Sequence, residues 1–519
     1  MELTILSTSD IHGYVFPTNY VKQGSLLPFG LARVATIMKE ERQKANGPVI
    51  TIDDGDFLEG SPLAYYVAQV QPVHNPQWLM DAYNQIGYDC GVLGNHEFNY
   101  GKHYLKLAIN ESDRHFVNAN VLNADGQAAL GQPFRIINRN GLKVAILGLT
   151  TQTVAQWERQ DNIEGLHFQS AVETARYFVP FLHQLADVVV VAYHGGFERD
   201  LNTGKPTEKN PGENEAYQLL KDIKGIDALI TGHQHRHIAA KVFGTPVTQP
   251  GFRGDAIGKI TLQIEKKDDR FVVEDSQAEL VYTKEAPLNK AIMESTASLD
   301  REVDSWLEQP LGKIDGSLTV TDPFQARITE SAYIEFIQRV QMATMGVDIS
   351  ATALFNNEGA GFENPITMRN IMTNYVYPDG LAVVQVTGKE LKEALERSAR
   401  YFVLDNDGEI AVNPSFVFPK HRQYNYDMYE GVNYEIRVSE PVGNRIQNLT
   451  YHDQPVKDDE PLKIVLNHYR AGGGGHYDMF SEDKIIAENK TSMSQIIADY
   501  LREHPLIKAD VNHNFKVIK

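Results

Sequence analysis

The sequence predicts a layered α/β protein with more than one domain, and two observations carry this prediction. In the first half of the chain, short strands rich in Val, Ile and Leu alternate with helical stretches. Most of these strands are continuous apolar runs, the pattern of strands that are buried on both faces of a sheet. The chain is also 519 residues long. At about 150 residues per domain, that length suggests two to four domains.

The elements of the first half follow from their local patterns. The apolar runs expected to form strands are residues 3–8, 49–52, 143–149, 187–192, 228–231 and 257–264. The stretches between them, such as residues 30–44 and 172–184, have helical patterns.

The pattern changes after Val281. Residues 286–309 carry apolar side chains at helical spacing, and Pro287 and Pro310 stand at the two ends of the segment. We therefore expect a linker helix over residues 286–310, between a first domain (1–285) and a second domain (311–519). In the second domain, helices are expected over residues 328–345 and 389–401, and strands over 381–386, 432–438 and 462–467.

Composition excludes several classes of protein. The 49 basic and 68 acidic residues give a net charge of −19, which repels nucleic-acid backbones and argues against a polymeric nucleic acid as the main partner. A mononucleotide held by a local positive centre, such as a metal, is still compatible with that charge. A single cysteine excludes a disulfide framework and a multi-cysteine metal cluster. Without an apolar run of roughly 18 residues or a basic leader, we expect a cytoplasmic protein with no membrane span, or an exported one if the sequence is a processed form.

Side chains of the metal-binding type follow strand after strand in the first half. The segments are Ser9-Asp10-Ile11-His12-Gly13, Asp53-Asp54-Gly55-Asp56, Gly94-Asn95-His96-Glu97, Tyr193-His194-Gly195-Gly196 and Gly232-His233-Gln234-His235. Ligand sites in layered α/β folds gather beyond the carboxyl ends of strands, so these segments are expected to deliver Asp, Asn and His to one rim.

These side chains suit a pair of divalent cations. Imidazole binds Zn, Mn and Fe, and carboxylate and amide oxygens suit harder cations. A bridging carboxylate can hold two ions roughly 3.5–4 Å apart, as in two-metal phosphoester hydrolysis. In an extended chain, the side chains of Asp10 and His12, at i and i+2, can point to one side, and the same applies to His233 and His235.

Together the ordered motifs resemble those of the calcineurin-like metallophosphoesterases. With a linker helix and a second domain of about 200 residues, the whole chain is similar to the 5′-nucleotidase / 2′,3′-cyclic-nucleotide phosphodiesterase group. The resemblance implies a β-sandwich flanked by helices (αββα), followed by a C-terminal α/β nucleotide-binding domain. It also implies a small-molecule nucleotide as the partner, and two divalent metal ions such as Mn or Zn.

The resemblance further implies a role for each matching residue. One ion would be held by Asp10, His12, Asp56 and His235, and the other by Asp56, Asn95, His194 and His233, with Asp56 bridging. His96 would face the phosphate and assist the leaving oxygen. Asp53 and Asp54 are interpreted as supporting or solvated, and His237 is left outside the ligand set.

Asn99 departs from one branch of the family. Many 5′-nucleotidases carry Asp at this place to orient the catalytic histidine, whereas the sequence His96-Glu97-Phe98-Asn99 resembles the cyclic-phosphodiesterase branch. Asn99 can hold the His96 imidazole by a hydrogen bond. A neutral amide does not stabilise an imidazolium as a carboxylate does, so general-acid behaviour of His96 is expected to be weaker.

Three segments of the second half resemble substrate-binding loops. Residues 353–361, which include Asn356, match a Gly-rich loop that ends in a phosphate-binding Arg in nucleotidases, but Phe362 follows here. The segments around Tyr424 and Tyr426, and around Tyr469, resemble two aromatic loops that sandwich the nucleobase. Tyr469 is expected to stack on the base, with either Tyr424 or Tyr426 on the other face.

The expected function is hydrolysis of 2′,3′-cyclic nucleotides to 3′-nucleotides by a metal-bridging hydroxide, with further 3′-nucleotidase action. One alternative is a 5′-nucleotidase or nucleotide-sugar hydrolase on the same scaffold, against which Asn99 and Phe362 argue. An alternative of another class is a non-catalytic nucleotide sensor, against which the complete ligand set argues. Base preference, native metal and oligomeric state are left open.

Overall fold

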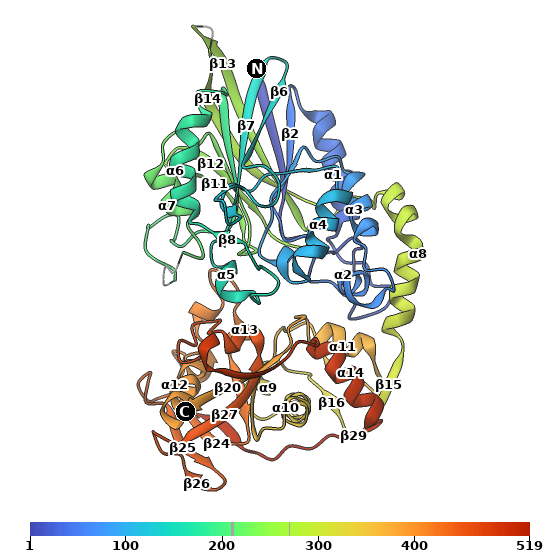
Figure 1. Ribbon diagram of the computed structural model, residues 1–519, viewed down its shortest axis with the longest axis vertical. Coiled ribbons are helices and arrows are strands. Elements are labelled where there is room, and N and C mark those ends of the chain that lie inside the picture. Colours follow the sequence, from blue (N-terminus) through green and yellow to red (C-terminus); the bar gives the residue numbers. More distant parts are fainter. Residues whose placement is uncertain (209–211, 269) are drawn as a thin grey trace. The chain divides into compact units, whose positions relative to one another are not determined.

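The computed structural model describes residues 1–208, 212–268 and 270–519 (Figure 1). The described chain divides into two compact units, Met1–Val303 and Asp304–Lys519. The expected linker segment contains this division, and its helix, α8, spans Lys290–Leu307. The domain boundaries at residues 285 and 310 stay a proposal.

The first unit contains two six-stranded sheets. The first sheet has the order β14 (Arg270–Tyr282), β13 (Ala256–Lys267), β1 (Glu2–Thr8), β2 (Val49–Asp53), β3 (Cys90–Gly91) and β4 (His115–Phe116). The second has the order β11 (His237–Val242), β12 (Thr245–Pro250), β10 (Ala228–Thr231), β9 (Val188–His194), β7 (Leu142–Thr150) and β6 (Phe134–Arg139). The strands β1 to β4, and β7, β9, β10 and β12, are parallel within their sheets, whereas β13, β14, β6 and β11 pair antiparallel.

Helices cover the outer faces of the two sheets. On one side lie α6 (Ala171–Leu182) and α7 (Ala216–Asp222), and on the other lie α1 (Leu31–Lys44), α3 (Gln77–Asn84) and α4 (Gly101–Glu111) (Figure 1). The order helix, sheet, sheet, helix confirms the predicted fold class. Shorter elements join these layers: α2 (Pro62–Tyr65), η1 (Tyr66–Val70), η2 (His96–Phe98), β5 (Val121–Leu122), α5 (Val154–Trp157) and β8 (His167–Phe168).

Strand β9 explains why the central strands are continuous apolar runs. Val188 and Val190 belong to the buried core between the two sheets, together with residues such as Ile5. Val189 and Val191 belong to a second core, which includes apolar side chains of α6 and α7. Because successive strand residues point to opposite faces, a strand covered on both faces is apolar at every position.

The second unit has a five-stranded mixed sheet and a smaller four-stranded one. The larger sheet has the order β23 (Asp427–Glu430), β17 (Ile349–Ala353), β27 (Pro461–Asn467), β20 (Leu381–Thr387) and β28 (Ile485–Asn489). The smaller has the order β26 (Gln454–Pro455), β25 (Ile446–Tyr451), β24 (Asn433–Arg437) and β30 (Phe515–Ile518). The main helices are α10 (Ala332–Met345), α11 (Met368–Asn374), α12 (Gly388–Ala399) and α14 (Met493–Glu503).

Each predicted helix and strand has a counterpart in the structure. Short elements complete the second unit. The short elements are β15 (Pro310–Asp315), β16 (Leu318–Thr319), α9 (Gln325–Ile328), β18 (Gly361–Phe362), β19 (Ile366–Thr367), β21 (Phe402–Leu404), β22 (Ile410–Val412), η3 (Pro414–Phe416), η4 (Gln423–Asn425), α13 (His468–Ala471), η5 (Glu482–Lys484) and β29 (Leu506–Lys508). Among the described residues, none of the helices has the length and apolar character that crossing a membrane requires.

A buried ion pair holds the end of β2 in place. The Arg114 guanidinium donates to Asp53 Oδ2, and both side chains are buried. The same guanidinium lies 4.2 Å from the ring centre of Phe57 and 4.4 Å from that of Tyr83. Asp53 also accepts a hydrogen bond of 2.7 Å from Thr8 Oγ1, which ties the ends of β1 and β2 together.

We predict that Arg114→Ala strongly destabilises the first unit, because it leaves the Asp53 carboxylate buried without its cation. The expected loss is about 3–5 kcal/mol in the free energy of unfolding, measured by denaturant titration. Arg139→Ala is the control, since the Arg139–Asp89 pair is partly exposed and such pairs contribute about 1 kcal/mol or less. Equal losses for the two variants would contradict the proposed role of Arg114.

Candidate dinuclear metal centre

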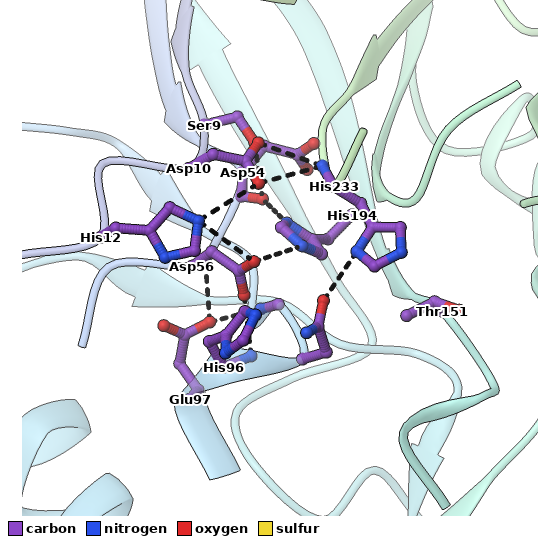
Figure 2. Close-up of polar contacts among 12 residues, drawn as sticks. Ser9, Asp10, His12, Asp54, Asp56, His96, Glu97, Thr151, His194 and His233 are labelled. Carbon is purple, nitrogen blue, oxygen red and sulfur yellow. Dashed lines mark hydrogen bonds and ion pairs between the residues drawn. The ribbon is translucent and has the colours of Figure 1, made fainter. Parts of the chain in front are cut away.

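The predicted ligands come together where strands of both sheets end. Asp10 follows β1, Asp56 follows β2, and His194 is the last residue of β9 (Figure 2). Asn95 follows β3 in the chain, and His233 and His235 follow β10. The parallel strands β1, β2 and β3 lie in one sheet and β9 and β10 in the other, so both sheets deliver side chains to one place.

Two groups of side chains have the spacing that a metal ion requires. The ligand atoms of Asp10, His12 and His235 lie within 4.8 Å of one another, and so do those of Asp56, His194 and His233. A carboxylate oxygen of Asp56 stands between the groups. Its Oδ2 atom is 3.2 Å from His194 Nε2 and 3.8 Å from His12 Nε2.

Asn95 and His235 extend these two groups. Asn95 Oδ1 is 2.8 Å from His233 Nδ1, beside the second group. His235 Nε2 is 3.1 Å from His12 Nε2 and 3.4 Å from Asp10 Oδ1, within the first group. The structure therefore brings together all seven side chains that the sequence nominated as metal ligands.

The outer nitrogens of three imidazoles are held by acceptors from the chain. His12 Nδ1 donates to the Glu59 carbonyl at 2.8 Å and His194 Nδ1 donates to the Asp54 carbonyl at 2.5 Å. His233 Nε2 lies 3.0 Å from Glu213 Oε1. Such outer hydrogen bonds fix the tautomer and the orientation of metal-binding histidines. Glu213 and the Glu59 carbonyl were not nominated by the sequence, because neither lies in a ligand motif.

The donor set fits a pair of divalent cations. Because Nδ1 of His12 carries the hydrogen, Nε2 of this ring presents a lone pair toward the Asp56 carboxylate, 3.8 Å away. A lone pair that faces a buried carboxylate is unfavourable unless a positive charge lies between them. Nitrogen and oxygen ligands of this kind suit Mn, Zn, Fe or Co.

The protonation state of His12 also fits metal binding. Burial lowers the pKa of the His12 imidazole to about 4, although the Asp56 carboxylate opposes this shift. The ring is therefore neutral at pH 7, and neutral imidazole is the form that binds metals. At Asp10, burial would raise the carboxyl pKa, but the hydrogen bond and charge of His235 lower it below its usual range.

The backbone at the ligands differs from the predicted extended conformation. Asp10 and His12 have φ angles of 56° and 53°, and His233 and His235 have φ angles of 65° and 56°. Asp56 is also in the left-handed region, with φ 54°. Asp10 and His12 lie in the first ligand group, whereas His235 lies in the first group and His233 in the second. Non-glycine residues in such conformations cluster at functional sites, where the surrounding structure holds them.

Glu97 holds the turn that carries Asp56. Its buried carboxylate accepts hydrogen bonds from the backbone N–H groups of Asp56, Phe57 and Leu58 at 2.8, 2.6 and 3.1 Å, and from Gly94 at 2.5 Å. One side chain therefore fixes the two loops that follow β2 and β3. Figure 2 shows Glu97 directly beside Asp56.

His96 lies beside the candidate metal ligands, and its Nδ1 atom has two oxygens within reach. Asn99 Oδ1 is 2.7 Å and Glu59 Oε2 is 2.9 Å from this nitrogen. The His96 backbone N–H donates to Asp56 Oδ1 at 2.8 Å. Burial lowers the pKa of His96, but the carboxylates of Asp56 and Glu59 outweigh it and raise the pKa to about 10. The weaker general-acid behaviour expected of His96 rested on Asn99 alone, whereas the structure also places the Glu59 carboxylate beside the ring.

The neighbouring candidates Asp53, Asp54 and His237 lie outside the ligand set. Asp53 and Asp54 are fully buried, so the solvated interpretation was wrong for both. Asp53 supports β2 through Arg114, and the Asp54 carbonyl accepts from His194. His237 begins β11, where its Nε2 is 2.9 Å from Asp255 Oδ2.

The two tyrosines near residue 425 lie in different environments. Tyr426 is fully buried, and its hydroxyl donates to the Arg327 carbonyl at 2.9 Å. Its ring stacks against Tyr401 at 5.1 Å between centroids. Tyr424 is half-buried, with its ring centre 6.3 Å from that of Tyr377. Tyr424 therefore has surface that a ligand can reach, whereas Tyr426 has the environment of a core residue.

One arginine ties the two aromatic loops together. Tyr469 is half-buried at the start of α13, and the adjacent Arg470 is buried. Arg470 Nε donates to Asp427 Oδ2 at 2.6 Å, and Nη2 donates to the Tyr424 carbonyl at 2.9 Å. These bonds hold the loop of Tyr424 against the loop of Tyr469.

The loop that contains Asn356 is shaped by its own hydrogen bonds. Asn356 Oδ1 accepts from the backbone N–H groups of Glu358 and Gly359 at 2.9 and 2.6 Å, and Nδ2 donates to the Thr373 carbonyl at 3.2 Å. Phe362, where nucleotidases place an Arg, is fully buried in β18.

Comparisons with known proteins give a family match for each half of the chain. Two family profiles match: "Calcineurin-like phosphoesterase" over residues 3–237 and "5'-nucleotidase, C-terminal domain" over residues 310–482. A 2',3'-cyclic-nucleotide 2'-phosphodiesterase/3'-nucleotidase of Salmonella typhimurium is 30% identical over 91% of this chain and 82% of its own length. The trifunctional nucleotide phosphoesterase protein YfkN of Bacillus subtilis is 27% identical over the whole chain, which spans 39% of that longer protein.

A solved structure extends the likeness to three dimensions. The crystal structure of a candidate 5'-nucleotidase from Staphylococcus aureus, in complex with alpha-ketoglutarate, has 35% sequence identity and a TM-score of 0.93. The alignment covers 100% of both chains.

We predict that Asp56→Asn abolishes metal binding at both positions, because one carboxylate stands between the two groups. Elemental analysis of the protein reconstituted with Mn²⁺ checks this result against the wild type. His237→Ala is the control and is expected to keep the wild-type metal content, since His237 pairs with Asp255 outside the cluster. Two ions per chain in Asp56→Asn would refute the bridging role.

Proposed function

We propose a function for this chain, which belongs to the family of calcineurin-like phosphoesterases that carry a 5′-nucleotidase C-terminal domain. The proposed reaction is hydrolysis of 2′,3′-cyclic nucleotides to 3′-nucleotides. Removal of the 3′-phosphate is the proposed second activity. The observation that carries the proposal is the convergence of two ligand groups on Asp56, with His96 hydrogen-bonded to the same carboxylate. A cytoplasmic location stays a prediction of the sequence.

Two divalent ions, such as Mn²⁺ or Zn²⁺, would be held by the two groups. When bound, such ions lower the pKa of water from 15.7 toward about 7 and neutralise charge on the phosphoryl oxygens. Asp10, His12, Asp56 and His235 would hold one ion, and Asp56, Asn95, His194 and His233 the other. The local positive charge also counters the net charge of −19, which would otherwise oppose an anionic substrate.

His96 would assist the leaving oxygen. A water molecule gives up a proton as its oxygen bonds to phosphorus, the bond between phosphorus and the ribose 2′-oxygen breaks, and that oxygen takes a proton from His96. Because Asn99 and Glu59 hold His96 by Nδ1, Nε2 on the opposite side of the ring is the atom that can donate. A positioned general acid of this kind typically contributes about 10²–10⁴-fold to the rate.

The half-buried tyrosines of the second unit would bind the base. We assign stacking to Tyr424 and Tyr469, because Tyr426 is buried against Tyr401. Stacking contributes roughly 1–3 kcal/mol per base and tolerates every base, so base preference is expected to be broad. Asn356 would contribute by shaping its loop, since both of its amide atoms bond to the backbone.

A 5′-nucleotidase is the second candidate. The Staphylococcus aureus structure with 35% identity favours it. The cyclic-phosphodiesterase proposal is supported by the relative named for that activity at 30% identity, and by Asn99 and Phe362. Phe362 is buried and carries no charge to bind a 5′-phosphate.

A steady-state comparison of substrates separates the candidates. With Mn²⁺-reconstituted protein, we expect kcat/KM for 2′,3′-cyclic AMP to exceed that for 5′-AMP by at least about tenfold, which is 1.4 kcal/mol in transition-state binding. The reverse order would contradict the proposal and favour the 5′-nucleotidase. Nucleotide binding without hydrolysis of either substrate would favour a non-catalytic sensor.

We predict that His96→Ala loses turnover by about 10²–10⁴-fold while it keeps both metal ions, because the ring assists the leaving oxygen and is not a ligand. Elemental analysis and kcat are measured on the same preparation. Unchanged turnover would refute the role of His96, and loss of an ion would show that the ring is needed for metal binding.

A further inference from the structure

Glu59 contacts the reactive centre through both its backbone and its side chain. It lies in the loop between β2 and α2, three residues after Asp56, and is 3% exposed. Its carbonyl accepts from His12 Nδ1 at 2.8 Å, and its Oε2 atom is 2.9 Å from His96 Nδ1. A single residue therefore orients a metal ligand and the neighbouring histidine.

The loop around Glu59 has little freedom to move. A Cβ atom at Gly60, where φ is +128°, would lie 2.7 Å from His12 Cβ, so the backbone packs directly on that ring. Ser61 Oγ donates to the Gly13 carbonyl at 2.8 Å and accepts from the Ala64 N–H at 3.0 Å. The backbone at Glu59 is consequently held against His12 and Gly13.

The contacts of Asn99 define its orientation at His96. Asn99 Nδ2 donates to Glu158 Oε2 at 2.7 Å, and Glu158 also accepts from Asn162 Nδ2 at 2.7 Å. Because the amide nitrogen is bonded to Glu158, Oδ1 is the atom that faces His96. Nδ1 of His96 thus has two acceptors, the Asn99 amide oxygen and the Glu59 carboxylate, and must carry a hydrogen.

We propose that Glu59 is the carboxylate partner of His96, a positioning residue that holds the ring so that Nε2 faces the leaving oxygen. Glu59 lies in the loop after β2 and supplies a negative charge to His96. An Asp at position 99 would supply the same charge from the loop after β3. The inference rests on the proposed hydrolysis of phosphoesters. Asn99 Oδ1 is the nearer acceptor, at 2.7 Å from Nδ1 against 2.9 Å for Glu59 Oε2. A contact with a buried carboxylate is roughly twice as strong as one with a neutral amide, so Glu59 stabilises this orientation of the ring together with Asn99.

Glu59→Gln isolates the carboxylate. The variant keeps the shape of the side chain and the backbone carbonyl that His12 needs. It removes the charge and leaves one acceptor oxygen, since the other oxygen becomes an NH2 group. Two substrates then distinguish leaving-group assistance from a general structural effect: 2′,3′-cyclic AMP, whose ribose oxygen needs a proton, and bis-p-nitrophenyl phosphate, whose nitrophenolate departs without one.

For Glu59→Gln we expect kcat on the cyclic nucleotide to fall by about 10–100-fold, with KM changed less than about threefold. Turnover of the nitrophenyl ester should stay within about threefold of the wild type, and the metal content should be unchanged. Glu41→Gln is the matched control, a buried glutamate on α1 paired with Lys259 and Lys44. It is expected to match the wild type on both substrates.

A second variant restores the carboxylate from the other loop. Glu59→Gln combined with Asn99→Asp is expected to recover most of the lost turnover on the cyclic nucleotide. Wild-type kcat in Glu59→Gln, an equal loss on both substrates, or the absence of recovery in the double variant would each overturn the proposal.

The design keeps this inference separate from the choice of substrate. If the wild type prefers 5′-AMP, the proposed cyclic-nucleotide specificity fails, and 5′-AMP then replaces the cyclic nucleotide in the same comparison. Its alkoxide leaving group also needs a proton, so the difference between Glu59→Gln on 5′-AMP and on the nitrophenyl ester still tests Glu59.

Discussion

The site depends on how the imidazole rings are oriented around the buried Asp56 carboxylate. His12 and His194 each give a hydrogen to a backbone carbonyl on their outer side, so their inner nitrogens face Asp56. Four backbone N–H groups bind Glu97 and fix the loops that carry Asp56 and His96. Backbone carbonyls and N–H groups thus orient the candidate ligands, so that inner nitrogens of His12 and His194 face the Asp56 carboxylate.

The scaffold explains why these ligands meet. Strands such as β9 are apolar on both faces because one face meets the opposing sheet and the other meets α6 and α7. The polar residues of those strands therefore stand at the ends, beyond the buried segment. Because the central strands of each sheet are parallel, their carboxyl ends deliver Asp, Asn and His from segments far apart in the sequence.

Much of this arrangement could be predicted from the sequence. The apolar runs located the central strands, and the motifs named the residues that converge, whereas β14 has no regular pattern of buried residues and was missed. The left-handed turns at Asp10 and His233 were also not predictable, because non-glycine residues rarely adopt that conformation. Glu59 and Glu213 escaped notice for a different reason. A glutamate next to a motif is usually solvated, and only the fold brings these carboxylates to His96 and His233.

The central claim is that two cations share Asp56, and anomalous diffraction from crystals of Mn²⁺-loaded protein tests it most directly. The account predicts two manganese peaks roughly 3.5–4 Å apart, with the Asp56 carboxylate bound to both. A single peak, or two peaks of which only one lies at Asp56, would contradict it.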